Sequence, residues 1–203
     1  MSKVLLTAFG EYGEWAQNAS WLAVVALTRN LPDDLQLTTR LYPVDFDLAL
    51  PQLTQELAKN YDYVLHVGQS PGSSRIQLEA IGLNIAGRVE QQPHEFQPLA
   101  EGGPVAYQSA LPLGDYTLKI REQGIPVEVS HHAGVYLCNA FLYWTHHQAA
   151  VQQLQTQATF VHLPLATSQV VGMRREYPSL PSETAAQALL ILLQELAGPA
   201  KLA

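Results

Sequence analysis

Cysteine, basic residues and long apolar runs are all scarce in this sequence, and each scarcity excludes a class of protein. The one cysteine, Cys138, cannot form an intramolecular disulfide. Lys and Arg number 11 against 18 Asp and Glu. Because phosphate binding needs a concentrated basic surface, we expect no nucleic-acid partner. No run of about 18 apolar residues occurs, so we expect no membrane-spanning segment and no membrane partner.

The rest of the composition is typical of a globular protein. Hydrophobic residues make up 47% and charged residues 14% of the 203 positions, and a chain of this size can bury most of its apolar surface around one core. We therefore expect a single domain over residues 1–203. The apolar run at 4–9 is too short for the core of a signal peptide, which predicts a cytoplasmic protein. The net charge of −7 favours a neutral or small substrate.

Strand-like and helix-like segments alternate along the chain. Short apolar runs at residues 4–9, 63–67 and 159–164 indicate buried strands, and the apolar aromatic run within 137–148 indicates a helix. This alternation predicts an α/β fold, namely a three-layer α/β/α sandwich with a central, largely parallel mixed sheet.

Candidate polar groups follow several of these strands. Sheets of this kind bind ligands in the crevice at the carboxyl ends of their strands. Gly68 and Gln69, His162 and the loop after Phe9 all follow strands, and Cys138 follows one by a short connection. The pattern therefore predicts a ligand site at this edge of the sheet.

Two further segments carry predictions that depend on local pattern alone. Between residues 75 and 86 the apolar residues nearly alternate, which predicts one strand with Glu79 among apolar neighbours. Residues 88–112 are rich in Gln, Pro and Gly and show no clear period, which predicts a long irregular loop. Loops of that length inside a compact domain are often functional.

Cys138 lies where a cysteine is easily activated. Gly134 allows a tight turn into the helix predicted over 137–148, so the thiol falls in the first helical turn. There the unpaired backbone N–H groups and the positive end of the helix dipole favour the nucleophilic thiolate. The alternative is a small buried hydrophobe, which is the usual role of a lone free cysteine. Local sequence leaves both interpretations open.

Five segments carry a resemblance to a known family, and each falls on an element that the hydrophobic pattern predicts independently. The segments are TAFGEYG with NASW at residues 7–13 and 18–21, HVGQ at 66–69, EAIGLN at 79–84, AGVYLCN at 133–139 and FVHLP at 160–164. In this order they resemble the motifs of the pyroglutamyl peptidase I family, also called pyrrolidone-carboxylate peptidases.

The resemblance implies a cysteine peptidase, specifically an omega peptidase that removes an amino-terminal pyroglutamyl residue from peptides without a cofactor. Cys138 is then the nucleophile that forms a thioester, His162 the general acid and base, and Glu79 the group that orients the imidazole. The implied partners are peptides that begin with pyroglutamate. The resemblance also implies a homo-oligomer, commonly a tetramer.

The resemblance implies a pocket for a flat five-membered lactam as well. The matching ring-packing positions are Phe9, Tyr12, Tyr136 and Leu137, and the matching polar positions are Asn18 and Gln69. Whether side chain or backbone touches the ring is not visible in the sequence.

The oxyanion needs hydrogen-bond donors, and the backbone N–H of Cys138 is the first candidate. Arg88 is the second by family analogy, although it aligns with the family's arginine only if one residue is deleted after Asn84. The chain departs from the family's pattern at other positions too, with Ala80 and Ser73 in place of arginines and Tyr12 in place of phenylalanine.

Each of these site residues can also be interpreted as having a purely structural role. Glu79 can be a surface carboxylate on an edge strand, His162 a hydrogen-bonded core histidine, and Arg88 a solvated loop charge. The pocket residues that can equally be plain core are Phe9, Tyr136 and Leu137.

Three rival functions also follow from the residues. Paired histidines at 131–132 and 146–147 suggest a zinc site, but adjacent histidines on a helix point in different directions and no carboxylate or second thiol is spaced to complete it, so we expect no metal. The altered loops suggest a protein that binds pyroglutamyl-like groups without cleaving them. A cysteine amidase of different specificity is the third possibility.

Overall fold

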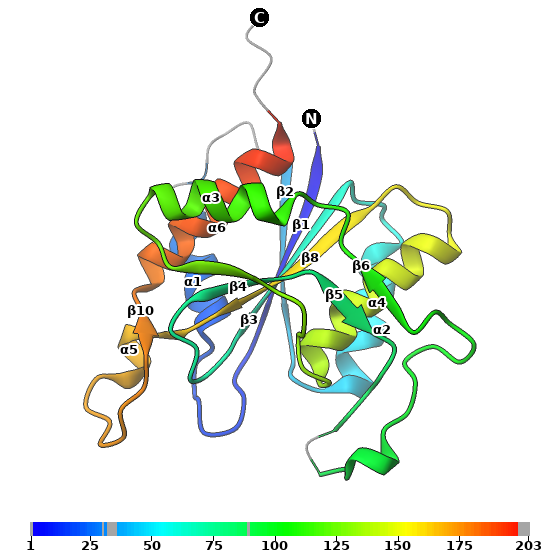
Figure 1. Cartoon of the computed structure of the whole chain (residues 1–203), viewed down its shortest axis with the longest axis horizontal. Helices are drawn as coiled ribbons and strands as arrows, with labels where there is room; N and C mark the ends of the chain where they lie inside the picture. Colours follow the sequence, from blue (N-terminus) through cyan, green and yellow to red (C-terminus); the bar gives the residue numbers. More distant parts are fainter. Residues whose placement is uncertain (1, 30, 32–35, 89, 199–203) are drawn as a thin grey trace, which may run out of the picture.

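A computed structural model describes residues 2–29, 31, 36–88 and 90–198 of the chain. Its helices and strands alternate through most of the sequence (Figure 1). In chain order they are β1 Lys3–Phe9, α1 Ala19–Thr28, β2 Gln36–Tyr42, α2 Phe46–Leu57, β3 Tyr63–Gln69, β4 Ile76–Glu79, β5 Ile81–Leu83, the 3-10 turn Pro93–Glu95, β6 Ala106–Gln108, α3 Leu113–Glu122, β7 Val127–Ser130, α4 Leu137–Val151, β8 Gln157–Leu163, β9 Leu165–Ala166, α5 Thr167–Val170, β10 Ser179–Leu180 and α6 Ser182–Ala197.

The central sheet has six strands in the order β2-β1-β3-β8-β4-β7. All neighbouring pairs are parallel except β4 and β8, which are antiparallel. Two small two-stranded sheets, β10-β9 and β5-β6, lie outside it. The predicted α/β class and the largely parallel mixed sheet are confirmed.

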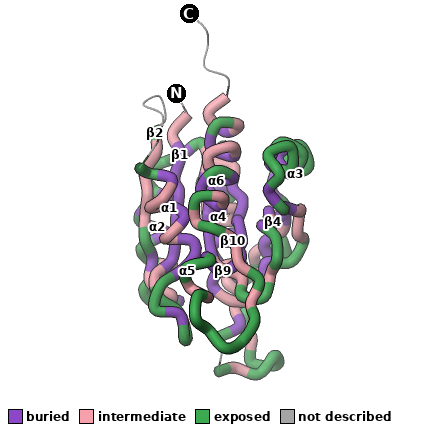
Figure 2. Tube along the Cα trace, turned by 90° about the vertical axis from the view of Figure 1, so that its left-hand side faces the viewer, coloured by how far each residue is buried: buried purple, intermediate pink, exposed green. Residues whose placement is uncertain are grey.

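Helices cover both faces of this sheet. Helices α1, α3 and α6 share one cluster of buried residues with the strands, and α2 and α4 share the other. Figure 1 shows the two groups on opposite sides of the sheet, and Figure 2 shows that residues of the central strands are buried. This is the three-layer sandwich that the alternation of elements predicts.

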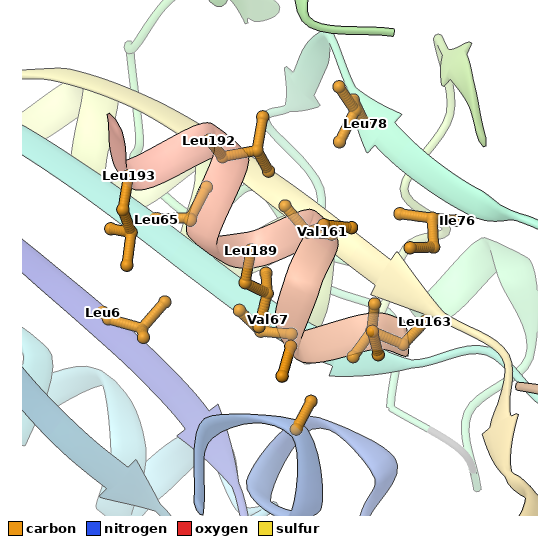
Figure 3. Packing of buried hydrophobic residues seen from close by; sticks show 14 of the residues in the cluster. Leu6, Leu65, Val67, Ile76, Leu78, Val161, Leu163, Leu189, Leu192 and Leu193 are labelled. Atoms are coloured by element: carbon orange, nitrogen blue, oxygen red, sulfur yellow. The ribbon is translucent and has the colours of Figure 1, made fainter. Parts of the chain in front are cut away.

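Helix α6 illustrates how the layers hold together. Leu189, Leu192 and Leu193 have helical spacing and face the strands, where they pack over Leu65 and Val161 (Figure 3). Burying one such leucine contributes about 1.5–3 kcal/mol. The strands are thereby fixed relative to one another, which is what a site assembled from several strand ends requires.

The predicted single strand over 75–86 is wrong. Strand β4 ends at Glu79, and β5 leaves the central sheet to pair with β6. Between them the backbone of Ala80 binds Ser130 and Ser109. At Gly82 the chain passes so close to α4 that a Cβ atom would lie 2.7 Å from the backbone nitrogen of Tyr143. This approach to a distant helix turns the chain out of the sheet, although the apolar alternation continues.

The long irregular loop predicted at 88–112 is partly regular. It contains the 3-10 turn Pro93–Glu95 and strand β6. Two side-chain amide contacts of Asn84, to the backbone nitrogen and oxygen of Ala100, hold this segment against the body of the domain.

Helix α4 begins as predicted, and Cys138 is its second residue. Gly134 has φ +78°, the left-handed conformation that glycine adopts without strain, so the expected turn into the helix is confirmed. None of the helices in the described part of the chain combines the length and apolar character that a bilayer crossing requires.

Candidate active site

The alternation of side chains along the strands brings the site residues to one face of the sheet. Val67 and Val161 lie beside α6 (Figure 3), and Leu78 belongs to the same buried cluster, so the residues next to them in sequence point to the opposite face, toward α4. Those neighbours include Gly68 and Glu79. By the same parity His162, which follows Val161, faces α4, the helix that carries Cys138.

Glu79 and His162 form a buried pair. Oε1 of Glu79 lies 2.7 Å from Nδ1 of His162. Their strands are adjacent, since β4 pairs with β8 and Glu79 lies opposite Phe160, two residues before His162. The carboxylate therefore holds the imidazole with Nδ1 toward β4, which leaves Nε2 available on the other side.

Cys138 lies over the end of β3, beside this pair. A Cβ atom at Gly68 would lie 3.3 Å from Sγ of Cys138, and Gly68 lies opposite His162 in the β3–β8 register. The thiol is half-buried. No side chain caps the first turn of α4 in the described structure, so its backbone N–H groups remain available to a ligand oxygen.

The charges in this cluster favour a protonated His162. Burial disfavours the imidazolium, but the negative charge of Cys138 and a hydrogen bond to it, followed by the hydrogen bond to Glu79, outweigh burial and raise the pKa of His162 to about 10. At neutral pH this pKa keeps the imidazole of His162 charged, between the sulfur of Cys138 and the side chain of Glu79.

A small cavity of about 50 Å³ opens beside the thiol. Its lining includes six of the seven residues predicted to bind the substrate, together with three residues for which the sequence did not predict this role. The lining consists of Phe9, Tyr12, Asn18, Gln69, Tyr136 and Leu137, with Val44, Gly68 and Cys138.

Aromatic side chains form much of the cavity wall. The rings of Tyr12 and Tyr136 lie 5.9 Å apart, and Phe46 contacts Tyr136 edge-on at 5.2 Å. Phe9 packs edge-on against Phe141, at 4.8 Å. A flat, weakly polar ring suits such walls, because aromatic faces bind apolar surface without competing hydrogen bonds.

The side chains of Asn18 and Gln69 are engaged away from the cavity. Asn18 caps α1 by accepting from Ser20, and its amide donates to the carbonyl of Gly10. Gln69 accepts from the backbone N–H of Ala19 through Oε1. Both side chains therefore fix the start of α1 at the edge of the cavity.

Arg88 is the predicted site residue that the structure does not bring to the cavity. Its guanidinium binds the carboxylate of Asp47 at 2.6 and 3.2 Å and lies over the ring of Phe46. The hydrogen bond to Asp47, followed by the opposing effect of slight burial, leaves the pKa of Arg88 raised. In this arrangement Arg88 supports the aromatic wall from outside.

A family model described as pyroglutamyl peptidase matches residues 2–197. The chain belongs to the pyroglutamyl peptidase family. It is thus a hydrolase of the pyroglutamyl peptidase type, and a non-cleaving binder or a cysteine amidase of other specificity is not favoured.

Relatives of known name support this assignment over nearly the full chain. A pyrrolidone-carboxylate peptidase of Thermococcus onnurineus is 34% identical, covering 95% of this chain and 97% of the relative. One of Pectobacterium atrosepticum is 33% identical, covering 97% and 93%. The solved pyrrolidone carboxyl peptidase of Fervidobacterium islandicum AW-1 has a TM-score of 0.90 at 28% identity, covering 97% and 98%. A mutant of the Pyrococcus furiosus enzyme has a TM-score of 0.87 at 30% identity, covering 96% and 97%.

The alternative interpretation of Glu79 as a surface carboxylate on an edge strand is wrong. Glu79 is only 1% exposed, and β4 lies between β8 and β7 rather than at an edge. Its second oxygen, Oε2, is buried with no hydrogen-bond partner among the described residues. A buried carboxylate with an unpaired oxygen lowers the stability of the fold unless its charge is compensated, here by the imidazole of His162.

The histidine pairs behave differently from a metal site. His146 is buried, and burial, opposed by a backbone hydrogen bond to Ala158, lowers its pKa to about 4. His147 lies 3.1 Å from the hydroxyl of Tyr107. Within the described ranges no three His, Cys, Asp or Glu side chains gather where a metal ion could bind.

Asn139 is a site residue whose role the sequence did not reveal. Its buried side chain accepts from the backbone nitrogen of Leu83 and donates to the carbonyls of Leu83 and Ile85. It thereby ties the first turn of α4, next to Cys138, to strand β5. A polar residue in an apolar helix start was the available signal, but its partners lie more than 50 residues away.

The sequence placed Gly68 at a strand end but did not reveal its close approach to Cys138, and its substitution tests that approach. We expect Gly68→Ala to lose roughly 1–3 kcal/mol of stability, because the new Cβ would lie 2.7 Å from the ring of fully buried Phe160. We expect kcat/KM to fall by roughly 10²-fold, because the displaced Cys138 thiol no longer meets the substrate carbonyl correctly. Urea unfolding and steady-state kinetics measure the two effects.

The control for this substitution is Gly114→Ala in α3, where a Cβ atom would meet nothing within 4 Å. It should leave kcat/KM unchanged. Wild-type kcat/KM in Gly68→Ala would show that the close approach between β3 and the thiol has no functional role.

Proposed function

We propose that this chain cleaves the bond between an amino-terminal pyroglutamyl residue and the rest of a peptide, with Cys138 as nucleophile, His162 as general acid and base, and Glu79 as the orienting group. The observation that carries the proposal is the 2.7 Å pair of Glu79 and His162 beside Gly68, whose Cβ position lies 3.3 Å from Sγ of Cys138. This arrangement provides a charged nucleophile, a proton donor and a fixed tautomer in one line.

In the first step the Cys138 thiolate attacks the pyroglutamyl carbonyl. The oxyanion that forms accepts hydrogen bonds from the backbone N–H groups in the first turn of α4, including that of Cys138 itself. His162 donates its proton to the leaving nitrogen as the C–N bond breaks. The peptide leaves with a free amino terminus, and the pyroglutamyl group remains on the sulfur as a thioester.

In the second step water releases the pyroglutamyl group. His162, now neutral, takes a proton from the water that attacks the thioester. The C–S bond breaks, pyroglutamate leaves, and the restored thiolate again faces an imidazolium. Glu79 keeps the ring in place through both steps, since its hydrogen bond to Nδ1 leaves only Nε2 to exchange protons with the reacting groups.

Recognition of the lactam is assigned to the aromatic walls and to the backbone of Gln69. Pairing between β1 and β3 ends at Thr7 opposite His66. The N–H of Ser70 points the other way, to Leu163 of β8. Backbone groups alternate sides along a strand, so the N–H and C=O of Gln69 face the gap between β1 and β3. One donor and one acceptor there match the carbonyl and N–H of a lactam.

The test of this function is cleavage of aminomethylcoumarin amides of pyroglutamate, proline and alanine in fresh reducing buffer. We expect the pyroglutamyl amide to be preferred by roughly 10³-fold or more, because a site built to bind both lactam groups rejects a ring that lacks the carbonyl. Binding of the pyroglutamyl amide without release of the fluorophore would contradict a peptidase. Similar rates with all three amides would point to an amidase of broad specificity.

We further propose that residues 1–203 act as one catalytic domain, in the cytoplasm and as a homo-oligomer. Support for one domain comes from the two buried clusters, which lie on opposite faces of the same sheet. A reducing compartment suits a mechanism that depends on one free thiol. The assembly follows from the family resemblance, and light scattering after gel filtration measures it.

A further inference from the structure

Gln169 lies outside the cavity lining but holds three of the segments that build the site. It belongs to the short helix α5, and its side-chain oxygen accepts from the backbone N–H of Ala166 at 2.7 Å. Its amide nitrogen donates to the carbonyl of Gln17 at 2.8 Å and to Oε1 of Gln69 at 3.1 Å. Because acceptor and both donors are used, the orientation of the amide is determined.

Each partner belongs to a different part of the site. Ala166 is in β9, directly after the strand that carries His162. Gln17 ends the loop that carries Tyr12, and Gln69 lines the cavity at the end of β3. The Gln169 side chain thus connects three segments: the chain just after the strand of His162, the loop that carries Tyr12, and the end of β3 that is proposed to bind the lactam.

The contact to Gln69 reaches the cavity through that residue's backbone. The side chain of Gln69 points to the α6 face, as Val67 does, and so away from Cys138. Its Oε1 binds both the N–H of Ala19 and Gln169. A side chain anchored on one face of the strand fixes the backbone N–H and C=O at the strand end.

A second contact joins the same two segments. The ring of Trp15, in the loop with Tyr12, packs edge-on against Tyr177 at 5.4 Å. Tyr177 lies in the segment between α5 and β10. The loop is therefore tied to the chain around α5 by a polar contact near its end and an apolar contact near its middle.

We propose that Gln169 is a positioning residue for lactam recognition, which sets the affinity of the site for the pyroglutamyl ring by holding the end of β3 and the Tyr12 loop in register. This inference rests on the proposed function. Gln169 touches neither Cys138, His162 nor Glu79, so its loss is expected to weaken ring binding without slowing the bond-breaking steps.

The test is Gln169→Leu, which removes all three hydrogen bonds at similar volume. We expect KM for pyroglutamyl aminomethylcoumarin, and the inhibition constant of pyrrolidinone, to rise together by roughly tenfold, the change expected for the loss of one or two hydrogen bonds. We expect kcat per reactive thiol to stay within about twofold, with thiols counted by iodoacetamide labelling. Gln152→Leu is the matched control, because Gln152 also donates to a glutamine, Gln148, but on the exposed end of α4.

A double variant separates positioning from a general loss of structure. Gln69→Leu breaks the same contact from the other side, so Gln69→Leu/Gln169→Leu should raise KM little more than the worse single variant. Unchanged KM and inhibition constant with lower kcat or fewer reactive thiols would overturn the proposal and leave Gln169 as a structural brace. Failure of the proposed function is a distinct result, because the wild-type chain would then not cleave the pyroglutamyl amide at all.

Discussion

Replacing Cys138 by alanine should reduce kcat for a pyroglutamyl amide by at least about 10⁴-fold. The substitution removes the only thiol in the chain, so no other cysteine can take over the attack. Serine at this position should be nearly as inactive, because a hydroxyl is a far weaker acid than a thiol and supplies almost no anionic nucleophile at neutral pH. Steady-state release of aminomethylcoumarin measures the loss.

Binding provides the control for the cysteine variants. Cys138 is half-buried and is one of the residues that line the cavity, but the aromatic walls come from other residues, so Cys138→Ala should still bind pyrrolidinone with nearly wild-type affinity by calorimetry. Labelling by iodoacetamide should reach one group per wild-type chain and none per variant chain. Cleavage that survives in Cys138→Ala would refute a mechanism through this thiol.

Replacing Glu79 by glutamine should lower kcat by roughly 10²- to 10⁴-fold, the range of a general acid and base that loses its orientation. Glutamine has the shape of glutamate, but its amide offers no negative charge to the imidazolium. Without the charge of Glu79, the effect of burial on the imidazolium is less fully offset, so the pKa of His162 should fall from its value of about 10.

The pH profile separates this effect from misfolding. Activity that needs protonated His162 is lost as the pH rises through the pKa of that group. A raised pKa extends activity to high pH, and a lowered pKa in Glu79→Gln should move the basic limb of the kcat profile to lower pH. Glu122→Gln, an exposed change at the end of α3, should leave the profile in place. An unshifted basic limb in Glu79→Gln would show that this carboxylate does not set the charge of His162.

The elements that depend on local pattern were predictable from the sequence. Apolar runs and helical spacing identify the main strands and helices, and their alternation leads to the confirmed three-layer fold. Gly134 and the apolar run after it are enough to place Cys138 in a first helical turn. These features depend on residues within a few positions of one another.

Contacts between distant segments were not predictable in the same way. Residues 75–86 alternate like one strand, yet Gly82 meets α4 some 60 positions further along and the strand divides. Arg88 aligns with a family arginine, yet Asp47 on α2 holds it outside the cavity. Gln169 has no motif of its own in the sequence, and its partners lie 100 and 152 positions away.

Two histidines summarise the difference between local pattern and spatial neighbourhood. Both His66 and His162 lie in apolar strands, and the apolar pattern around them does not distinguish the two; only the family resemblance assigns a catalytic role to His162. The sequence alone determined that each is held on a buried strand. Strand order and register then place His66 between Thr7 and Thr145, where burial, followed by the charge of His146, lowers its pKa to about 3.

The same register places His162 beside Glu79 and opposite Gly68, under the thiol of Cys138, where its pKa rises to about 10. Protonation depends on which charges lie within a few ångströms, and for His162 these come from strand β4 and helix α4. The opposite pKa values of the two histidines are therefore a property of the assembled sheet, while the positions of the strands are a property of the local sequence.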